Sequence, residues 1–367
     1  MRILVITPWY PTIAAPIAGV FVRRDAELVA SSHELELVHL VDPALLTPAD
    51  VAADAASPYP VHRVPMSRSR PGDLVSAWRR IRDLSRGFDV VHTQAFQALL
   101  PFQGHRMRMP WVHSEHWSGI GDSNSLTARG RLVLRLTGRL LRRPDVVTAV
   151  SSHLLSAVAK FRSGPTMIVP SVVPDVSPAP ADRDPDVLRL VAVGHLVDGK
   201  DPVLAVRTVQ ELRRRGVPTT LEWVGDGPLR GQIEELIAGD DGFTLRGTLD
   251  SAGVSAALSR ADMFLLPTRG ETLCLSAIEA ISHGRPAVLG ALGGQRDYVT
   301  DQNGRLVEVR TPNAYADAVL DVRSRLNRLD PDSVAATIRG RFSAHAVLQG
   351  YNGAYEQAMS MHGKSLL

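Results

Sequence analysis

Two glutamates in the second half of the chain, Glu271 and Glu279, are separated by seven residues within GETLCLSAIEA (270–280). The apolar run DMFLLP (262–267) comes directly before them, and the helical pattern CLSAIEAISHG (274–284) contains the second glutamate. In open parallel sheets, ligands bind beyond the carboxyl ends of the strands, where loops lead into helices. The pattern therefore predicts one carboxylate in a loop over a strand end and another about two turns into the next helix.

The start of this predicted helix is suited to an anion, because the first backbone N–H groups of a helix have no partner inside it. These are the N–H groups of Thr272, Leu273, Cys274 and Leu275. Carboxylates accept hydrogen bonds from pairs of hydroxyls, so two of them around an anion site suggest a ligand with phosphate between two polyols. A nucleotide sugar has this chemistry. Taken alone, Glu271 could instead cap the helix and Glu279 could be a solvated helix residue.

Short apolar runs alternate with helical patterns along the whole chain, and such runs are typical of parallel strands covered on both faces. The strand candidates of the first half are RILVITP, LELVHLV, DVVHTQ, WVHSEH, VVTAVS and TMIVPS. Those of the second half are LRLVAVGHL, TTLEWVGDG, GFTLRG, ADMFLLP, RPAVLG and GRLVEV. The predicted fold class is therefore α/β, with two doubly wound Rossmann-like domains.

The two halves are separated by PDVSPAPADRDPDV (174–187), which holds four prolines and four aspartates and has no helical period. Such a composition is typical of a linker. We therefore predict a first domain at 1–175, a linker at 176–187, a second domain at 188–340 and a C-terminal helix at 341–367.

The composition is that of a soluble globular protein, with 44% apolar and 22% charged residues in 367. Cys274 is the one cysteine, so an internal disulfide is excluded and a reducing cytoplasm is expected. Pro8 and Pro11 interrupt the N-terminal apolar run, which does not resemble a signal peptide. No run reaches the roughly 18 apolar residues that indicate a membrane span.

The first half is basic: residues 1–180 hold 20 Lys/Arg and 14 Asp/Glu. Within RGRLVLRLTGRLLRRP (129–144), leucine recurs every fourth residue as Leu132, Leu136 and Leu140, each preceded by an arginine. One interpretation is a helix that packs its leucines in the core and solvates its arginines. The other is attraction to anionic lipid headgroups or a phosphorylated acceptor. Nucleic acid is disfavoured, because no aromatic residues interleave with the arginines.

Several motifs together resemble family-four glycosyltransferases of the GT-B fold. In the second half they are the E-x7-E segment, GDGPLR (225–230) and ALGGQRDYVTDQNGRLV (291–307). In the first half DVVHTQ, WVHSEHWSG and PDVVTAVSSHL follow the family's order, and RFSAHAVLQGYNGAYEQAM (341–359) resembles its C-terminal segment. The resemblance spans nearly the whole chain. It implies two Rossmann-like domains that face a central cleft, an acceptor-binding first domain, a donor-binding second domain, and a C-terminal helix that crosses back to the first.

The resemblance also implies roles for individual residues. Glu271 would bind hydroxyls of the donor sugar, Glu279 the nucleotide ribose and Lys200 the diphosphate. A fixed cation stabilises charge on a departing nucleoside diphosphate, so Lys200 has suitable chemistry. Gly19 would let the backbone approach the phosphates, and His116 would reach the sugar or the acceptor. Without the resemblance, Lys200 would be a surface lysine and His116 a hydrogen-bonded core residue.

Gly194 and His195, with the backbone of 272–275, complete the implied donor-binding set. The family usually has arginine where this sequence has His195, and Arg269 and Arg296 are nearby candidates to supply the charge. We interpret His92, in DVVHTQ, as structural. Cys274 has no partners at the spacing of a nucleophilic triad.

The implied function is retaining transfer of a hexose from a nucleoside diphosphate sugar, of UDP or GDP type, to an acceptor hydroxyl. The acceptor would be a glycan, a lipid-linked compound or a small molecule. No cofactor is expected and no metal, since the Asp-x-Asp text at 182–184 lies in the predicted linker. A redox Rossmann enzyme is disfavoured, because TPWYPT and not G-x-G-x-x-G follows the first strand.

Two alternatives remain open. One is a nucleotide-sugar epimerase or hydrolase on the same fold. The other is a catalytically silent nucleotide-binding partner of a glycan-assembly complex, suggested by His195 and by Ser171 and Val172 where the family often has Asn-Gly. The expected location is the cytoplasm, with peripheral contact between the basic first domain and the inner face of the plasma membrane as a further option. The Arg- and Ala-rich composition suggests a bacterial source.

Overall fold

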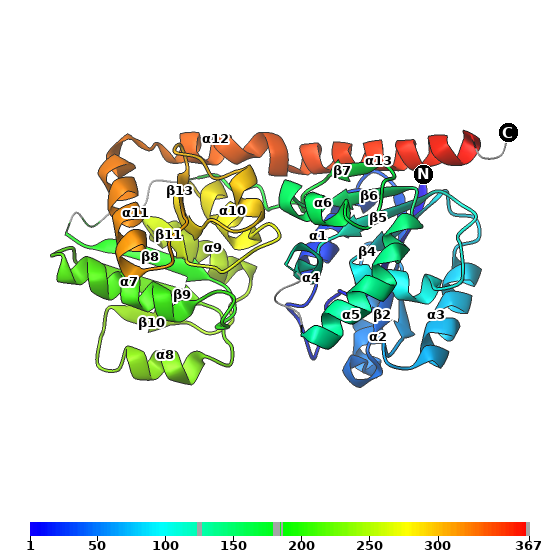
Figure 1. Cartoon of the computed structure of the whole chain (residues 1–367), viewed down its shortest axis with the longest axis horizontal. Coiled ribbons are helices and arrows are strands. Elements are labelled where there is room, and N and C mark those ends of the chain that lie inside the picture. Colours follow the sequence, from blue (N-terminus) through cyan, green and yellow to red (C-terminus); the bar gives the residue numbers. More distant parts are fainter. Residues whose placement is uncertain (123–126, 179–183, 185, 365–367) are drawn as a thin grey trace. The chain divides into compact units, whose positions relative to one another are not determined.

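The computed structural model describes residues 1–122, 127–178, 184 and 186–364 (Figure 1). The chain forms two compact units: unit 1 is Met1–Val172 with Ala344–Leu367, and unit 2 is Val173–Ser343. Part of the predicted linker, 179–183 and 185, lies outside the described residues. Among the helices that are described, none is both long and apolar enough to cross a membrane.

Unit 1 is built on a seven-stranded parallel sheet with strand order β3-β2-β1-β4-β5-β6-β7. Its strands are β1 (Arg2–Thr7), β2 (Glu34–Val41), β3 (Val61–Pro65), β4 (Val90–Gln94), β5 (Trp111–Glu115), β6 (Val146–Ala149) and β7 (Thr166–Ile168). Its helices are α1 (Val20–Ala30), α2 (Pro48–Asp54), α3 (Pro71–Leu84), α4 (Ser118–Gly121), α5 (Ala128–Thr137), α6 (Ser152–Val158) and α13 (Ala344–Lys364). Short 3₁₀ segments lie at Pro43–Leu45, Phe96–Phe102 and Gly138–Arg142.

The central strands of this sheet follow directly from the sequence pattern. All residues of β4 and β5 are buried, as are five of the six in β1, because helices cover both faces of a parallel sheet. The sequence pattern missed β3. Only Val64 is buried in this edge strand, and Arg63 and Pro65 interrupt the apolar run.

The last helix, α13, belongs to unit 1 and packs against β5, β6 and β7 (Figure 1). Val347, Tyr351 and Tyr355 are fully buried on one face of this helix. The Tyr355 hydroxyl lies 2.9 Å from Nδ1 of His92, whose Nε2 lies 2.7 Å from the Ser114 hydroxyl. His92 is therefore buried and hydrogen-bonded at both ring nitrogens, which confirms its structural interpretation.

A buried carboxyl group connects α1 to α13. Asp25 is fully buried, and its carboxyl oxygens accept hydrogen bonds from the Val172 N–H (2.9 Å) and the Tyr351 hydroxyl (3.0 Å). Burial raises the pKa of Asp25 to about 7, although these hydrogen bonds oppose the shift. Its ordinary value is 3.8. The folded chain therefore binds a proton here at pH values where the unfolded chain does not.

This raised pKa predicts that the Asp25 contribution to the free energy of unfolding increases as pH falls from about 7 towards 4, by up to about 4 kcal/mol. Above pH 7 the buried charge is destabilising, and Asp25→Asn removes it. We expect Asp25→Asn to be more stable than wild type at pH 8, with an advantage that shrinks at pH 5. Denaturant unfolding at both pH values checks this, with the exposed Glu356→Gln of α13 as control. An advantage of equal size at both pH values would contradict it.

Unit 2 is built on a six-stranded parallel sheet with strand order β10-β9-β8-β11-β12-β13. Its strands are β8 (Leu188–Val193), β9 (Thr219–Val224), β10 (Phe243–Leu245), β11 (Met263–Leu266), β12 (Ala287–Gly290) and β13 (Gly304–Val307). Its helices are α7 (Pro202–Arg214), α8 (Arg230–Leu236), α9 (Ser251–Arg260), α10 (Leu275–Ser282), α11 (Pro312–Arg325) and α12 (Pro331–Phe342). Short 3₁₀ segments lie at Gly294–Asp297 and Leu326–Arg328.

Both sheets have a topological switch point, where chain order reverses between neighbouring strands. It lies between β1 and β4 in unit 1 and between β8 and β11 in unit 2. The two strands at a switch point are neighbours, and the loops that follow them both begin at the same edge of the sheet. Side chains far apart in sequence therefore meet there. The fold thus predicts where each unit binds a ligand.

The interpretation of the arginine-rich segment as a helix that packs its leucines in the core is wrong in one respect. Helix α5 ends at Thr137, and the expectation that Leu132 and Leu136 pack in the core fails, because both are exposed. The buried leucines of this segment are Leu134 and Leu140. A four-residue leucine period marks one face of a helix but does not say whether that face points inward.

Candidate active site

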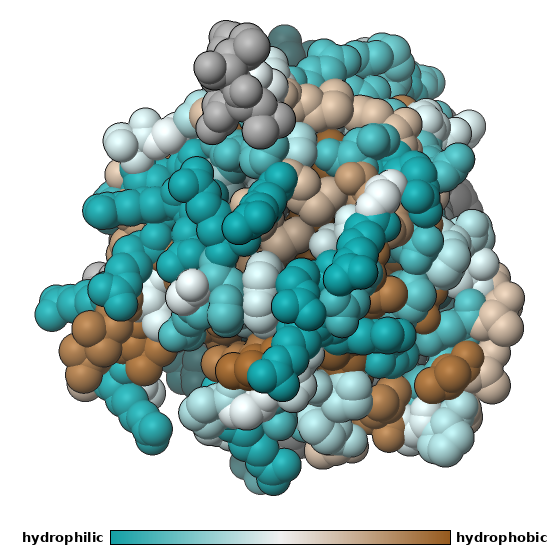
Figure 2. Space-filling model, turned by 90° about the vertical axis from the view of Figure 1, so that its right-hand side faces the viewer, coloured by the Kyte–Doolittle hydropathy of each residue, from teal (hydrophilic) through white to brown (hydrophobic). Residues whose placement is uncertain are grey.

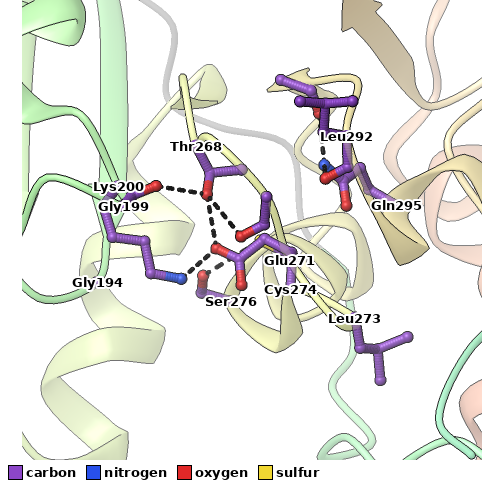
Figure 3. Close-up of polar contacts among 12 residues, drawn as sticks. Gly194, Gly199, Lys200, Thr268, Glu271, Leu273, Cys274, Ser276, Leu292 and Gln295 are labelled. Atoms are coloured by element: carbon purple, nitrogen blue, oxygen red, sulfur yellow. Dashed lines mark hydrogen bonds and ion pairs between the residues drawn. The ribbon is translucent and has the colours of Figure 1, made fainter. Parts of the chain in front are cut away.

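The ends of β8 and β11 bring a cation and a carboxylate together. Lys200 follows β8 and Glu271 follows β11, and Nζ of the lysine donates to Oε1 of the glutamate (Figure 3). The side chains are 23% and 13% exposed, so the pair is mostly shielded yet reachable from solvent. Two predicted site residues that are 71 positions apart in sequence are therefore in direct contact at the switch point.

Sequence reasoning missed Thr268, which fixes the Glu271 carboxylate. The Thr268 hydroxyl lies 3.0 Å from Oε1 of Glu271 and also donates to the Gly199 carbonyl at 2.9 Å (Figure 3). The Arg269 N–H donates to the same carbonyl at 2.8 Å. The loops after β8 and β11 are thereby held to each other, which positions Lys200 beside Glu271. A polar residue directly after a buried strand was the available signal for Thr268.

A partly buried ion pair stabilises the base of these loops. Asp201 caps α7 from a left-handed backbone conformation (φ 51°) and pairs with Arg310 at 2.5 Å. Arg310 also donates to the carbonyls of Pro267 (2.8 Å) and Thr268 (2.7 Å). Because one guanidinium binds the end of β11 and the start of α7, it supports the backbone on both sides of the site.

A backbone contact fixes the position of Glu271. Its N–H donates to the Leu292 carbonyl (3.2 Å), its carbonyl accepts from the Gly294 N–H (3.0 Å), and it forms an isolated parallel bridge with Gly293. Gly293 has φ +123°, and a Cβ there would overlap the Glu271 carbonyl and lie 2.8 Å from its nitrogen. Only glycine fits this close approach. Gly293 and Gly294, which belong to the motif at 291–307, therefore hold Glu271 in place.

The start of α10 offers backbone N–H groups close to this pair. The helix begins at Leu275 after Cys274, which has a left-handed conformation (φ 67°) and makes no side-chain cap. Within the described part of the chain, the N–H groups of Thr272, Leu273 and Leu275 have no hydrogen-bond acceptor. The Tyr298 hydroxyl donates to the Leu273 carbonyl at 2.9 Å, which fixes the segment from behind. The arrangement can receive an anion.

Glu279 lies nearer the start of α10 than predicted. It is the fifth residue of the helix, a little more than one turn from Leu275, and the helix begins one residue later than predicted. It is half-buried. Its carbonyl accepts from Nδ1 of His283 at 2.7 Å, and Nε2 of His283 lies 2.8 Å from the Ser255 hydroxyl. A ribose-binding role for its carboxylate stays a prediction.

Gly194 and His195 lie directly after β8. The Gly194 carbonyl accepts from Nε1 of Trp223 at 2.8 Å, and the Lys200 stem passes beside Gly194, where a Cβ would lie 3.5 Å from it in ordinary van der Waals contact. His195 is exposed, and its Nδ1 lies 3.2 Å from the Asp226 carbonyl. Its side chain is thus available at the surface, without contact to Lys200.

The two arginines considered as substitutes for a cation at His195 already have partners. Arg269 pairs with Asp201 at 3.1 Å, and Arg296 pairs with Glu308 at 2.5 Å. Lys200 is therefore the cation that contacts Glu271 among the described residues.

The electrostatics keep Lys200 charged and Cys274 neutral. Burial lowers the pKa of Lys200, but the Glu271 carboxylate outweighs it and raises the pKa above 10.5. Burial raises the pKa of the Cys274 thiol to about 12, so a nucleophilic thiolate is not available at neutral pH. Within the described residues, no group of three His, Cys, Asp or Glu side chains is arranged to hold a metal ion. Metal independence stays a prediction.

In unit 1, the loop after β1 ends at Gly19, the N-cap of α1. Gly19 has φ +71°, and a Cβ there would overlap the Trp9 carbonyl and lie 2.6 Å from the Tyr10 nitrogen. The loop therefore folds back against its own start, and glycine is required for that approach. The predicted contact with phosphates remains a prediction.

His116 lies just beyond β5, at the same edge of the sheet of unit 1. Its ring is buried, packs against Phe21 with centroids 5.2 Å apart, and has no hydrogen-bond partner at Nε2 within the described residues. Burial lowers the pKa of His116 to about 3, so the ring is neutral at physiological pH. Glu115 fixes the turn by accepting from the His116 N–H at 2.9 Å. An unpaired buried nitrogen favours a ligand-binding role over a purely structural one.

Sequence reasoning missed two glutamines, one at the end of β4 and one in the 3₁₀ segment that follows. Gln94 and Gln97 are buried, and Oε1 of each has no partner within the described residues. Ala95 between them has φ 65°, which is unusual for a residue with a Cβ. Polar side chains at the end of a buried strand, in HTQAFQ, were the available signal. These amides join His116 as candidates for binding hydroxyls.

Two family models match the chain, one in each unit. Glycosyltransferase Family 4 matches residues 13–175, and Glycosyl transferases group 1 matches residues 188–324. The chain belongs to glycosyltransferase family 4. This confirms the family that the motifs in both halves predicted, including the E-x7-E segment.

Named relatives of this family-4 chain transfer different sugars. It is 28% identical to 2-deoxystreptamine glucosyltransferase of Streptomyces kanamyceticus, over 65% of this chain and 66% of that one. It is 30% identical to the GDP-mannose-dependent alpha-(1-6)-phosphatidylinositol monomannoside mannosyltransferase of Mycolicibacterium smegmatis, over 61% and 62%. It is 35% identical to the sulfoquinovosyl transferase of Arabidopsis thaliana, over 29% and 21%. The chain thus spans less than two thirds of the length of each of these relatives.

Solved structures confirm the GT-B fold of this family-4 chain. Anabaena HepE in complex with UDP superimposes with a TM-score of 0.76 at 16% identity, over 97% of this chain and 100% of that one. Sucrose-phosphate synthase from Thermosynechococcus elongatus gives a TM-score of 0.75 at 18% identity, over 98% and 100%. At these identities the likeness concerns the fold alone.

Proposed function

We propose that the chain is a retaining, metal-independent glycosyltransferase that moves a hexose from a nucleoside diphosphate sugar to an acceptor hydroxyl. The observation that carries the proposal is the Lys200–Glu271 pair at the switch point of unit 2, beside the open N–H groups at the start of α10. A cation and backbone donors suit a diphosphate, and a fixed carboxylate suits sugar hydroxyls. Membership of glycosyltransferase family 4 agrees with that chemistry.

In this proposal Lys200 binds the diphosphate and stabilises the charge that develops on it as the glycosidic bond breaks. Glu271 accepts hydrogen bonds from hydroxyls of the transferred sugar, and Glu279 accepts them from the ribose. The N–H groups at 272–275 add partial positive charge next to the phosphates. A divalent cation would then not be needed at the leaving group, because Lys200 and these amides supply the positive charge.

Unit 1 supplies the acceptor side in the proposal. His116, neutral at physiological pH, can accept or donate one hydrogen bond at Nε2. The amide oxygens of Gln94 and Gln97 can accept from acceptor hydroxyls. In a retaining reaction the departing phosphate can take the acceptor proton, so none of these side chains must be a strong base. Such a set of neutral polar groups suits a carbohydrate as the acceptor substrate, because they can form hydrogen bonds with its hydroxyls.

The UDP bound to HepE and the GDP-mannose used by the mycobacterial relative support a nucleotide-sugar donor of UDP or GDP type. The sugar acceptors in the relatives' names range from an aminocyclitol to phosphatidylinositol mannosides. A glycan, lipid-linked or small-molecule acceptor is therefore proposed for this chain.

One observation favours a second candidate, the catalytically silent nucleotide-binding partner. His195 replaces the family's usual arginine, and Arg269 and Arg296 are held by Asp201 and Glu308. A site with a single cation, Lys200, could bind a nucleotide without turning it over.

Donor consumption separates these functions. Each of the common UDP and GDP sugars is incubated with the chain, with and without a set of glycoside and glycolipid acceptors, and free nucleoside diphosphate and new glycoside are measured. A transferase forms a glycoside in step with nucleoside diphosphate, and NMR of the product should show the donor's anomeric configuration. Equal donor consumption with and without acceptor would indicate a hydrolase or epimerase and overturn the proposal. Binding of a donor with no consumption would support the silent partner.

A further inference from the structure

Helix α5 of unit 1 carries apolar side chains on a face that no described residue covers. Leu132, Val133 and Leu136 are 56%, 49% and 59% exposed. Successive residues of a helix turn by about 100°, so Leu132 and Leu136 share one face, Val133 adjoins it and Leu134 points the opposite way. Leu134 is buried and anchors the helix to unit 1. Figure 2 shows a face of the molecule on which hydrophilic residues predominate and hydrophobic residues form separate patches.

Arginines flank these apolar side chains. On the same helical projection Arg129 and Arg135 lie on either side of Leu132. Arg139 lies beyond the end of α5, in the 3₁₀ segment Gly138–Arg142, and all three arginines are exposed. None of the three forms an ion pair within the described part of the chain. The segment from Ala128 to Arg143 contains no aspartate or glutamate, so nothing local neutralises them.

Contacts at both ends of α5 stabilise the helix. The Thr127 hydroxyl caps its start by accepting from the Gly130 N–H at 3.1 Å, and the Phe161 ring packs against Gly138 at its end. Arg142 donates to the Phe161 carbonyl at 2.7 Å. The cap stabilises the first turn of α5, and the buried Leu134 together with the contacts to Phe161 attaches the segment to unit 1.

We propose that the surface formed by α5 and the start of the 3₁₀ segment after it docks the protein on an anionic phospholipid membrane; its residues are Leu132, Val133, Leu136, Arg129, Arg135 and Arg139. A ten-residue helix is far too short to cross a bilayer, but it can lie in the plane of the headgroups. Three apolar side chains would enter the boundary of the acyl chains, while the flanking arginines bind lipid phosphates. The mixture of an apolar centre and a basic rim matches the chemistry of that boundary.

Other occupants fit this surface less well. A second copy placed symmetrically on it would bring arginines against arginines, since the surface contains no carboxylate. A nucleic acid backbone would leave the three apolar side chains against phosphates. A free phosphorylated molecule would engage the arginines but not the leucines. A lipid surface uses both, and the inference does not depend on the proposed transferase activity.

Vesicle binding of the full chain tests the proposal. Sedimentation is measured with vesicles of phosphatidylcholine alone and with phosphatidylglycerol added. Three chains are compared: wild type, Leu132→Ser/Val133→Ser/Leu136→Ser, and Arg129→Gln/Arg135→Gln/Arg139→Gln. The matched control is Leu45→Ser/Val51→Ser/Val75→Ser, which removes three other exposed apolar side chains of unit 1. Circular dichroism establishes that each variant folds.

We expect wild type and control to bind the phosphatidylglycerol vesicles, with affinity that falls as salt is added. The serine variant should bind at least tenfold more weakly. Each arginine near an anionic surface is worth roughly a factor of five, so the glutamine variant should lose on the order of 100-fold. Absence of wild-type binding to both vesicles overturns the proposal. Binding that the serine and glutamine variants retain also overturns it. So does self-association of wild type through this face, if that alone explains why the serine variant does not bind vesicles.

Discussion

We expect the replacement of Lys200 with methionine to lower the turnover of the nucleotide-sugar donor by about 10²–10³-fold, which corresponds to about 2.7–4 kcal/mol of transition-state stabilisation. Methionine keeps the length and packing of the stem beside Gly194 but removes the charge that contacts Glu271. Glu271→Gln should lose a similar amount, because an amide cannot accept hydrogen bonds from sugar hydroxyls at both of its end atoms. Steady-state turnover of the two variants, with circular dichroism of each, measures the effect.

The control for the lost charge is Lys160→Met, which removes an exposed lysine of unit 1 and should turn over normally. The double variant Lys200→Met/Glu271→Gln should be little slower than either single variant, because residues that act on one reacting group are not additive. Turnover within a factor of three of wild type in both single variants would mean that the chemistry occurs elsewhere. Lys200 contacts Glu271 in the folded chain, so either substitution could also destabilise the fold. The melting temperature of each variant separates such destabilisation from a loss of catalysis.

Gly293→Ala is expected to have the second-largest effect, by displacing Glu271 without removing any polar side chain. The new Cβ would overlap the Glu271 carbonyl, and alanine is strained at φ +123°. Both effects push the bridge between Gly293 and Glu271 apart, and a misplacement of about 1 Å at a catalytic group costs on the order of 100-fold in rate. We therefore expect turnover to fall by roughly that factor, with a destabilisation of about 1–3 kcal/mol.

Gly199→Ala is the matched control for this variant. It lies next to Lys200, has an ordinary backbone conformation, and a Cβ there would meet nothing within 4 Å. Its carbonyl would still accept from Thr268 and Arg269. Normal turnover in Gly293→Ala, together with an unchanged melting temperature, would show that the bridge does not position Glu271.

The fold was predictable because its strands are continuous apolar runs between turn residues. Runs such as DMFLLP and RILVIT are typical of strands buried on both faces of a parallel sheet. The edge strand β3 escaped prediction because an edge needs little burial, and VHRVP has one buried residue. The face of α5 was also not predictable, since the same four-residue leucine period serves a buried or an exposed stripe.

The site was predictable in its residue types but not in its supports. Glu271 could be singled out because it follows a predicted strand, whereas Lys200 was assigned through the resemblance to family-four glycosyltransferases. The hydrogen bond from Thr268 and the bridge from Gly293 depend on how two loops fold over each other, and no local pattern encodes that. The helix begins at Leu275, one residue later than predicted, because Cys274 has a left-handed backbone conformation that cysteine rarely adopts.

The measurement that tests a donor site in unit 2 most directly is thermal unfolding in the presence of UDP, GDP, ADP or dTDP, for wild type and Glu279→Ala. A ligand that binds only the folded chain stabilises it by about 2.7 kcal/mol at a hundredfold excess over its Kd. We expect one nucleotide to raise the melting temperature of wild type and of the control Glu235→Ala on α8, and Glu279→Ala to lose that shift. No shift with any nucleotide, or a full shift in Glu279→Ala, would contradict the proposed donor site.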